Sequence, residues 1–260
     1  MSVSELDPWT LAWIGLAMGL LWLLSLLAAD ASIVDVFWGL GFILVAVAAA
    51  RPEAPGARQA LAGGLATVWG LRLATHIFLR NRGKGEDPRY GAMRRRWGKA
   101  FGVISLATVF ALQGVLMWIV SLPVQAAMRA DAPADLGPLD YAGAGVWLIG
   151  FAFEATGDFQ LTRFASKDDN AGKVMDLGLW RYTRHPNYFG DSLAWWGFGL
   201  IGLATGAWWS LVGPLVMTVL LLRVSGVSLL ERHMAKTRPD YDAYKERTSA
   251  FVPMPPKTAS

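Results

Sequence analysis

Hydrophobic residues gather along this chain in long runs that few charged residues interrupt. Seven such runs cover residues 9–29, 33–50, 61–79, 101–122, 139–157, 188–204 and 208–230. A membrane has a hydrocarbon core of about 30 Å, which takes roughly 20 helical residues to cross. The pattern therefore predicts an all-α integral membrane protein, a single domain over residues 1–260 with seven transmembrane helices and a cytosolic tail from residue 231.

The composition agrees with this prediction and narrows the chemistry. Of the 260 residues, 54% are hydrophobic and 17% are charged, which is more apolar than an ordinary soluble domain. The chain has no cysteine, so disulfides, thiolate metal sites and thiol nucleophiles are excluded. The three histidines have no ligand spacing in common, so we expect no metal site.

The distribution of basic residues predicts an orientation in the membrane. Lys and Arg gather in segments 80–99, 163–184 and 232–247, whereas the opposite side has only Arg51, Arg58 and Arg129. Basic loops stay on the cytoplasmic side. With seven spans, the N-terminus is then periplasmic, the C-terminus is cytoplasmic, and all three basic segments form cytosolic loops.

Ionisable residues inside the apolar runs are costly and indicate function by default. Asp35 begins the second run, and two pairs spaced by four residues, Arg72/His76 and Glu154/Asp158, each share a helix face. Internal salt bridges are the alternative explanation, and Asp35 could simply pair with Arg72.

The most distinctive string is Gly178-Leu-Trp-Arg-Tyr-Thr-Arg-His-Pro-Asn-Tyr-Phe-Gly-Asp191. It combines cations and amides suited to phosphate with aromatic rings suited to stacking, and a helix that begins near Asn187 would offer free N–H groups to an anion. The alternative is a loop of aromatic residues at the membrane interface. The chain has no Gly-x-Gly-x-x-Gly after a strand, so a Rossmann site is not expected.

This string resembles the signature of the bacterial relatives of steroid 5-alpha-reductases, and an Arg-His-Pro pattern also occurs in isoprenylcysteine carboxyl methyltransferases. Asn81-Arg-Gly83, the spacing of Asn187, Asp191 and Trp195, and the tail from Tyr241 to Pro253 are similar to the reductases. The likeness covers most of the chain from the second run onward. It implies a bacterial inner-membrane enzyme that reduces the C4–C5 double bond of a 3-oxo-4-ene steroid, or a similar lipophilic enone, with NADPH held by cytosolic loops.

The resemblance and the residue chemistry together predict a set of cofactor contacts. These are Arg72, His76, Asn81, Arg82, Glu154, Asp158, Arg163, Lys167, Arg181, Tyr182, Arg184, His185, Asn187, Tyr188, Asp191, Trp195, Glu231, Tyr241 and Tyr244. The 2′-phosphate of NADPH would be held by Arg82, Lys84, Arg163 or Lys167, which the sequence does not rank.

The predicted catalytic residues are Asp35, Trp38 and Trp69. Hydride addition to an enone places negative charge on the carbonyl oxygen, so a donor must face that oxygen. Asp35 lies where the steroid enzymes carry a glutamate, and burial favours its protonated, donating form. The tyrosine of the steroid enzymes has no counterpart in the third run, where Trp69 is the nearest residue.

Two other classes of function stay open. One is a methyltransferase that uses S-adenosylmethionine on a lipid or prenylated acceptor, and the other is a channel, transporter or scaffold. The many cations favour a phosphate-bearing cofactor, and the polar groups do not follow a path through the membrane midplane. Membrane lipid and a lipophilic small molecule are the expected partners, nucleic acid is not, and a monomer is the working expectation.

Overall fold

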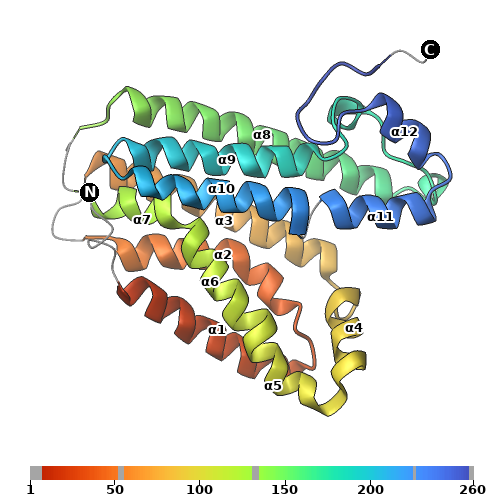
Figure 1. Cartoon of the computed structure of the whole chain (residues 1–260), viewed down its shortest axis with the longest axis horizontal. Coiled ribbons are helices and arrows are strands. Elements are labelled where there is room, and N and C mark those ends of the chain that lie inside the picture. The colour runs from red at the N-terminus through yellow and green to blue at the C-terminus, as the bar shows by residue number, and fades with distance from the viewer. Residues whose placement is uncertain (1–7, 52–55, 131–134, 225–226, 258–260) are drawn as a thin grey trace. The chain divides into compact units, whose positions relative to one another are not determined.

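The computed structural model describes residues 8–51, 56–130, 135–224 and 227–257, and most of these residues are helical. No strand occurs there, although an isolated β-bridge joins Thr183 to Ser249. The prediction of an all-α protein is confirmed. The α-helices, shown in Figure 1, are α1 (Pro8–Ala28), α2 (Ile33–Ala49), α3 (Ala57–Asn81), α4 (Pro88–Trp97), α5 (Phe101–Ser105), α6 (Leu112–Val120), α7 (Leu122–Arg129), α8 (Pro138–Ala165), α9 (Pro186–Leu203), α10 (Val212–Val219), α11 (Val227–Thr237) and α12 (Tyr241–Arg247).

The chain forms two compact units. Unit 1 consists of Met1–Asp140 and Ile201–Val212, and unit 2 consists of Tyr141–Leu200 and Gly213–Ser260. No shift in composition marks the boundary between them, because apolar helices continue from one unit into the other. Each unit is described by itself below.

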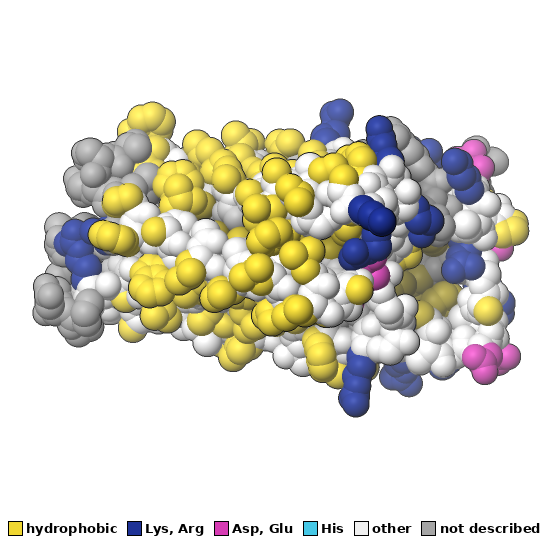
Figure 2. Space-filling model, turned by 90° about the horizontal axis from the view of Figure 1, so that it is seen from below, with side chains coloured by type: hydrophobic (Ala, Val, Ile, Leu, Met, Phe, Trp, Pro, Cys, Tyr) yellow, Lys and Arg dark blue, Asp and Glu magenta, His cyan; other side chains and the backbone are white. Residues whose placement is uncertain are grey.

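Two helical stretches among the described residues are long and apolar enough to cross a membrane. They are Pro8–Ala28 and Pro88–Val120, the second of which joins α4, α5 and α6. Ile33–Ala49 and Trp208–Val224 are apolar but shorter. Large hydrophobic side chains cover much of the face seen in Figure 2, with Lys and Arg at its margins. On α1, Leu16, Leu20, Leu23 and Leu27 are exposed. The structure thus supports a membrane protein, while the seven spans stay a prediction.

Unit 1 is built on the close packing of α2 against α3. A Cβ atom added to Gly39 would lie 2.1 Å from the carbonyl oxygen of Gly70, so the two backbones approach as closely as only glycine permits. Arg58, at the start of α3, forms a buried ion pair with Asp140. Arg58 Nε lies 2.7 Å from Asp140 Oδ1. These contacts fix the faces of α2 and α3 that carry the predicted catalytic residues.

Unit 2 is built on an equally close pair, α8 and α9. A Cβ atom on Gly150 would lie 2.4 Å from the amide nitrogen of Ala194, and one on Gly190 would lie 2.3 Å from that of Glu154. The Thr218 hydroxyl of α10 joins the same bundle by accepting a hydrogen bond from Trp196 at 3.1 Å. The first turn of α9 is thereby held against the middle of α8.

Helix positions differ from the sequence pattern in several places, among them α7, which lies in an expected connection, and α8, which continues to Ala165 instead of ending at residue 157. Segment 80–99 was expected to be a loop, but Pro88–Trp97 is the helix α4, with Asp87 capping its first turn through the amide of Arg89. The seventh run was expected to continue to residue 230, but its apolar helix ends at Val224 and α11 follows as a separate helix. Hydrophobicity alone identified neither helix, because α4 is strongly basic and α11 has one apolar and one polar face.

Candidate cofactor and carbonyl sites

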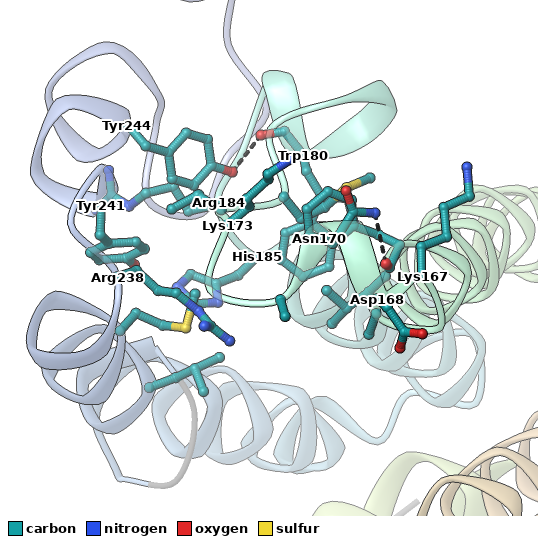
Figure 3. Close-up of a pocket in the computed structure, with 18 residues that line it drawn as sticks. Lys167, Asp168, Asn170, Lys173, Trp180, Arg184, His185, Arg238, Tyr241 and Tyr244 are labelled. Atoms are coloured by element: carbon teal, nitrogen blue, oxygen red, sulfur yellow. Dashed lines mark hydrogen bonds between the residues drawn. The ribbon is translucent and has the colours of Figure 1, made fainter.

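A cavity of about 310 Å³ lies within unit 2, inside the range of about 300–1,000 Å³ that is typical of ligand sites. Apolar residues of α8 and α11 line the cavity together with cations and aromatic rings, which Figure 3 labels. The lining residues are Leu161, Phe164, Ala165, Lys167, Asp168, Asn170, Ala171, Lys173, Val174, Met175, Trp180, Arg184, His185, Leu230, Met234, Arg238, Tyr241 and Tyr244.

Arg184 is the buried centre of this cavity. Its side chain is 7% exposed. Arg184 Nη2 lies 2.7 Å from Glu231 Oε1, and Nε donates a hydrogen bond to the same oxygen at 2.8 Å. Nη1 donates to the carbonyl oxygens of Lys245, at 3.0 Å, and Thr248. The guanidinium is therefore fixed by α11 and by the end of α12 at once.

Glu231 carries the compensating charge. Burial raises the pKa of this carboxyl, but the hydrogen bonds from His185 and Arg184 and the charge of Arg184 outweigh burial and hold the pKa below its usual range. Burial and the charge of Glu231 raise the pKa of the neighbouring Tyr241 to about 12. The cavity thus contains an ionised pair and a phenol that keeps its proton.

His185 is one of the described side chains that have a buried polar atom without a hydrogen-bond partner. It is 2% exposed, its Nε2 lies 3.4 Å from Glu231 Oε1, and its ring stacks on Tyr188 at 5.5 Å between centroids. Its Nδ1 has no hydrogen-bond partner in the described part of the chain, and the same holds for Nε of Arg238. Buried polar atoms are normally paired, so both point to a ligand that would complete them.

The C-terminal segment holds the Arg-His-Pro loop in place. Ser249 accepts a hydrogen bond from the amide of Arg184 at 2.8 Å, and Phe251 accepts one from the Thr183 hydroxyl at 2.8 Å. The amide of Met254 donates to Tyr182 at 3.0 Å, and the Tyr244 hydroxyl donates to the carbonyl of Trp180. Residues far apart in the chain therefore set the position of Arg184 together.

The predicted cofactor residues of unit 2 fall into three groups. Lys167, Arg184, His185, Tyr241 and Tyr244 line the cavity, and Glu231 bonds to two of them. Close to this group, Asp158 accepts a hydrogen bond from the Asn187 amide at 2.9 Å, and Glu154, Tyr188, Asp191 and Trp195 are buried or half-buried along the same helices. Arg163, Arg181 and Tyr182 are exposed.

Sequence reasoning missed several cavity residues. Trp180 lies within the distinctive string but had no assigned role, and its indole donates to Gly157 at 3.1 Å. Arg238 comes from the linker between α11 and α12, and its position next to the cavity depends on that turn. The signal available in the sequence was its closeness to Tyr241 and Tyr244.

A second polar cluster lies within unit 1 and contains Asp35. Asp35 Oδ1 accepts a hydrogen bond from the Tyr90 hydroxyl at 2.7 Å, and Asp35 Oδ2 accepts one from Arg89 Nη2 at 2.7 Å. The structure thus shows an ion pair between Asp35 and Arg89 of α4. The sequence had suggested Arg72 of α3 as the partner of Asp35. Tyr90 is 5% exposed and was missed, because segment 80–99 was interpreted as a basic loop.

Aromatic residues of α2 and α3 contact one another within the same unit. The ring of Trp38 lies 5.6 Å from that of Phe42, which lies 5.5 Å from that of Trp69. The predicted catalytic residues Asp35, Trp38 and Trp69 are therefore brought to neighbouring faces of α2 and α3. The predicted cofactor residues Arg72 and His76 are half-buried on α3, while Asn81, half-buried, and Arg82, exposed, follow at its end.

Comparison with known proteins places the chain in a family. The model of a family described as "Protein of unknown function (DUF1295)" matches residues 21–248, so the chain belongs to this family. An uncharacterised protein of Schizosaccharomyces pombe is 24% identical over 249 residues, which cover 84% of this chain and 67% of that protein. No solved structure matches the chain.

Proposed function

We propose that this protein is an integral membrane reductase that uses NADPH to reduce the double bond of a lipophilic enone, such as a 3-oxo-4-ene steroid. In this proposal it has seven transmembrane helices and lies in a bacterial inner membrane with a cytoplasmic C-terminus. The resemblance of the Gly178–Asp191 string supports the reaction class, and the two polar clusters supply the chemistry that the reaction needs.

The observation that carries the proposal is the cavity of unit 2. Its cations Arg184, Lys167, Lys173 and Arg238 suit the phosphates of a dinucleotide, and the rings of Trp180, Tyr241 and Tyr244 suit a base. His185 Nδ1 and Arg238 Nε are buried without a partner among the described residues, as expected of a site that is completed by its cofactor. NADPH fits this donor set better than S-adenosylmethionine, which has no phosphate.

The cluster of unit 1 suits recognition of the enone carbonyl. When bound, NADPH supplies a hydride to the β-carbon of the enone and leaves as NADP⁺, and the α-carbon gains a proton. Asp35 and Tyr90 share a hydrogen bond in an apolar setting beside Trp38, so the pair can offer a proton to an oxygen that becomes negative. Arg89 adds a positive charge next to the same pair.

A binding experiment tests the cofactor. Purified protein in detergent is titrated with NADPH, NADH and S-adenosylmethionine, and thermal unfolding is followed. We expect NADPH to give the largest rise in Tm. Arg184→Met should abolish that rise, whereas Arg95→Met, at an exposed arginine of α4 that belongs to no predicted site, should not. A rise with S-adenosylmethionine alone would replace the proposal by a methyltransferase.

A turnover experiment tests the reaction. NADPH consumption is measured with a 3-oxo-4-ene steroid, and the product is checked for the loss of the double bond. Asp35→Asn and Tyr90→Phe should each keep NADPH binding and lose most of kcat, since removal of an aimed donor costs about 100- to 1,000-fold. If both variants reduce the enone at the wild-type rate, the assignment to this pair is wrong.

A further inference from the structure

The Asp35–Tyr90 pair is one end of a longer hydrogen-bonded chain within unit 1. The indole of Trp38 donates to Gln113 Oε1, and Gln113 Nε2 donates to the Tyr90 hydroxyl oxygen at 3.0 Å. Tyr90 then donates to Asp35 at 2.7 Å, and Arg89 donates to the other oxygen of Asp35. Three helices, α2, α4 and α6, thus share one polar network.

The residues at the two ends of this network, Trp38 and Arg89, determine which atom donates in every hydrogen bond between them. An indole N–H and a guanidinium can only donate. Trp38 therefore requires the carbonyl oxygen of Gln113, which turns the amide N–H₂ toward Tyr90. The oxygen of Tyr90 must then accept from Gln113, so its single hydroxyl hydrogen points away from Gln113 and toward Asp35.

We infer that Gln113, oriented by Trp38, is a positioning residue that holds the Tyr90 hydroxyl hydrogen on Asp35, so that this pair keeps its proton in one place until charge develops on the enone carbonyl. This inference rests on the proposed function, because it concerns the donor of that reaction. A phenol without this partner could rotate its hydrogen away from Asp35 and so break the pair that the proposed function assigns to the enone carbonyl. A donor that is already oriented needs no reorganisation when charge develops on the substrate.

The local shape of the helix around Gln113 agrees with a special role. Residues Leu106–Ala111 form a π-helical stretch, and the amide of Leu112 accordingly bonds to the carbonyl of Ala107, five residues back. Such wide turns inside α-helices occur frequently at functional sites. Gln113 is the second residue after this stretch, where the changed winding decides which side chain faces Tyr90.

The chain offers a matched control in Gln125. This glutamine of α7 is buried in unit 1, where Gln113 is half-buried, and it accepts a hydrogen bond from Thr10 at 3.1 Å. Its amide nitrogen donates to Ser121 Oγ at 2.8 Å and to the carbonyl oxygen of Trp118 at 3.1 Å. Its substitution therefore removes a comparable network without touching Tyr90.

The first experiment compares Gln113→Glu and Gln113→Leu with Gln125→Glu and Gln125→Leu. A protonated carboxyl at position 113 reproduces the amide pattern, since it accepts from Trp38 and donates to Tyr90, whereas the ionised form cannot donate. We expect Gln113→Glu to retain kcat at low pH and to lose it by about tenfold or more as pH rises. Gln113→Leu should be slow at every pH, and KM for NADPH should not change in either variant.

The second readout requires no turnover. With tyrosine labelled at Cζ, the NMR signal of Tyr90 reports the hydrogen bonds of its oxygen. It should move in Gln113→Leu and in Trp38→Phe, and stay in place in Gln125→Leu. An unmoved Tyr90 signal, or a kcat–pH profile of Gln113→Glu that matches Gln125→Glu, overturns the positioning role. A wild-type protein that consumes no NADPH with an enone overturns the proposed function instead.

Discussion

Arg184 and Glu231, 47 residues apart in the sequence, form an ion pair in which Nη2 lies 2.7 Å from Oε1 and the arginine side chain is 7% exposed. Arg184 belongs to the loop before α9, and Glu231 belongs to α11. The pair therefore joins the distinctive string to the C-terminal part of the chain, and it places His185 against the same carboxylate.

Loss of the Glu231 charge should destabilise unit 2. Glu231→Gln leaves Arg184 buried with no opposite charge from this residue, and breaking a buried pair in this way costs about 3–5 kcal/mol. We expect a lower Tm and a weaker NADPH response. Glu246→Gln, an exposed glutamate on α12, is the control and should unfold like the wild type.

The same pair predicts a pH dependence of stability. The pKa of Glu231 is lower in the folded protein than in the unfolded chain. Its contribution to the free energy of unfolding is therefore complete above the unfolded pKa of about 4.3 and is lost as pH falls through the folded pKa. Thermal unfolding of the wild type should therefore show a Tm that declines over this acidic range. A curve for Glu231→Gln that declines just as steeply would contradict this assignment.

Arg238 should distinguish NADPH from NADH. Its Nε is buried at the cavity without a partner in the described residues, and the 2′-phosphate is a dianion that such a group can bind. A hydrogen bond to a charged group contributes about 1.5–3 kcal/mol, so Arg238→Gln should raise Kd for NADPH roughly tenfold or more and leave Kd for NADH unchanged. Lys236→Gln, at an exposed position of the preceding helix α11, should change neither Kd. If Arg238→Gln weakens the binding of both cofactors equally, Arg238 does not bind the 2′-phosphate.

Gly39 should be intolerant of any side chain. Gly39→Ala places a Cβ atom 2.1 Å from the carbonyl of Gly70, which forces α2 and α3 apart at a cost of about 1–3 kcal/mol or more. Gly15→Ala in α1 adds the same atom with nothing within 4 Å and removes the same helix-destabilising glycine. Only the first variant should lower Tm in detergent, and equal behaviour of the two would argue against the tight contact.

The predicted topology is open to a direct measurement. Seven spans place the two ends of the chain on opposite sides of the membrane, with the basic segments inside. Reporter fusions at residue 2 and at residue 260 should therefore show a periplasmic N-terminus and a cytoplasmic C-terminus. Two fusions that report the same side would exclude an odd number of spans.

The sequence by itself determined the features that depend on local patterns. Runs of apolar residues located α1, α2 and α9 to within one or two residues, because a helix in an apolar setting needs only continuous hydrophobicity and a start signal such as Pro186. The string from Gly178 to Asp191 identified Arg184 and His185 as candidates, because cations, amides and rings at that density are unusual in an interfacial loop.

Only the tertiary structure decided which distant residues meet. Asp35 contacts Tyr90, 55 residues away, because α4 is a helix that the basic composition of segment 80–99 concealed. Gln113 faces Tyr90 after a π-helical stretch that no hydrophobic pattern reveals. Arg238 reaches the cavity because the turn after α11 brings it there. Hydrophobic periodicity records which face of a helix avoids water, but hydrogen-bond partners across helices depend on their packing, which one sequence does not encode in any local window.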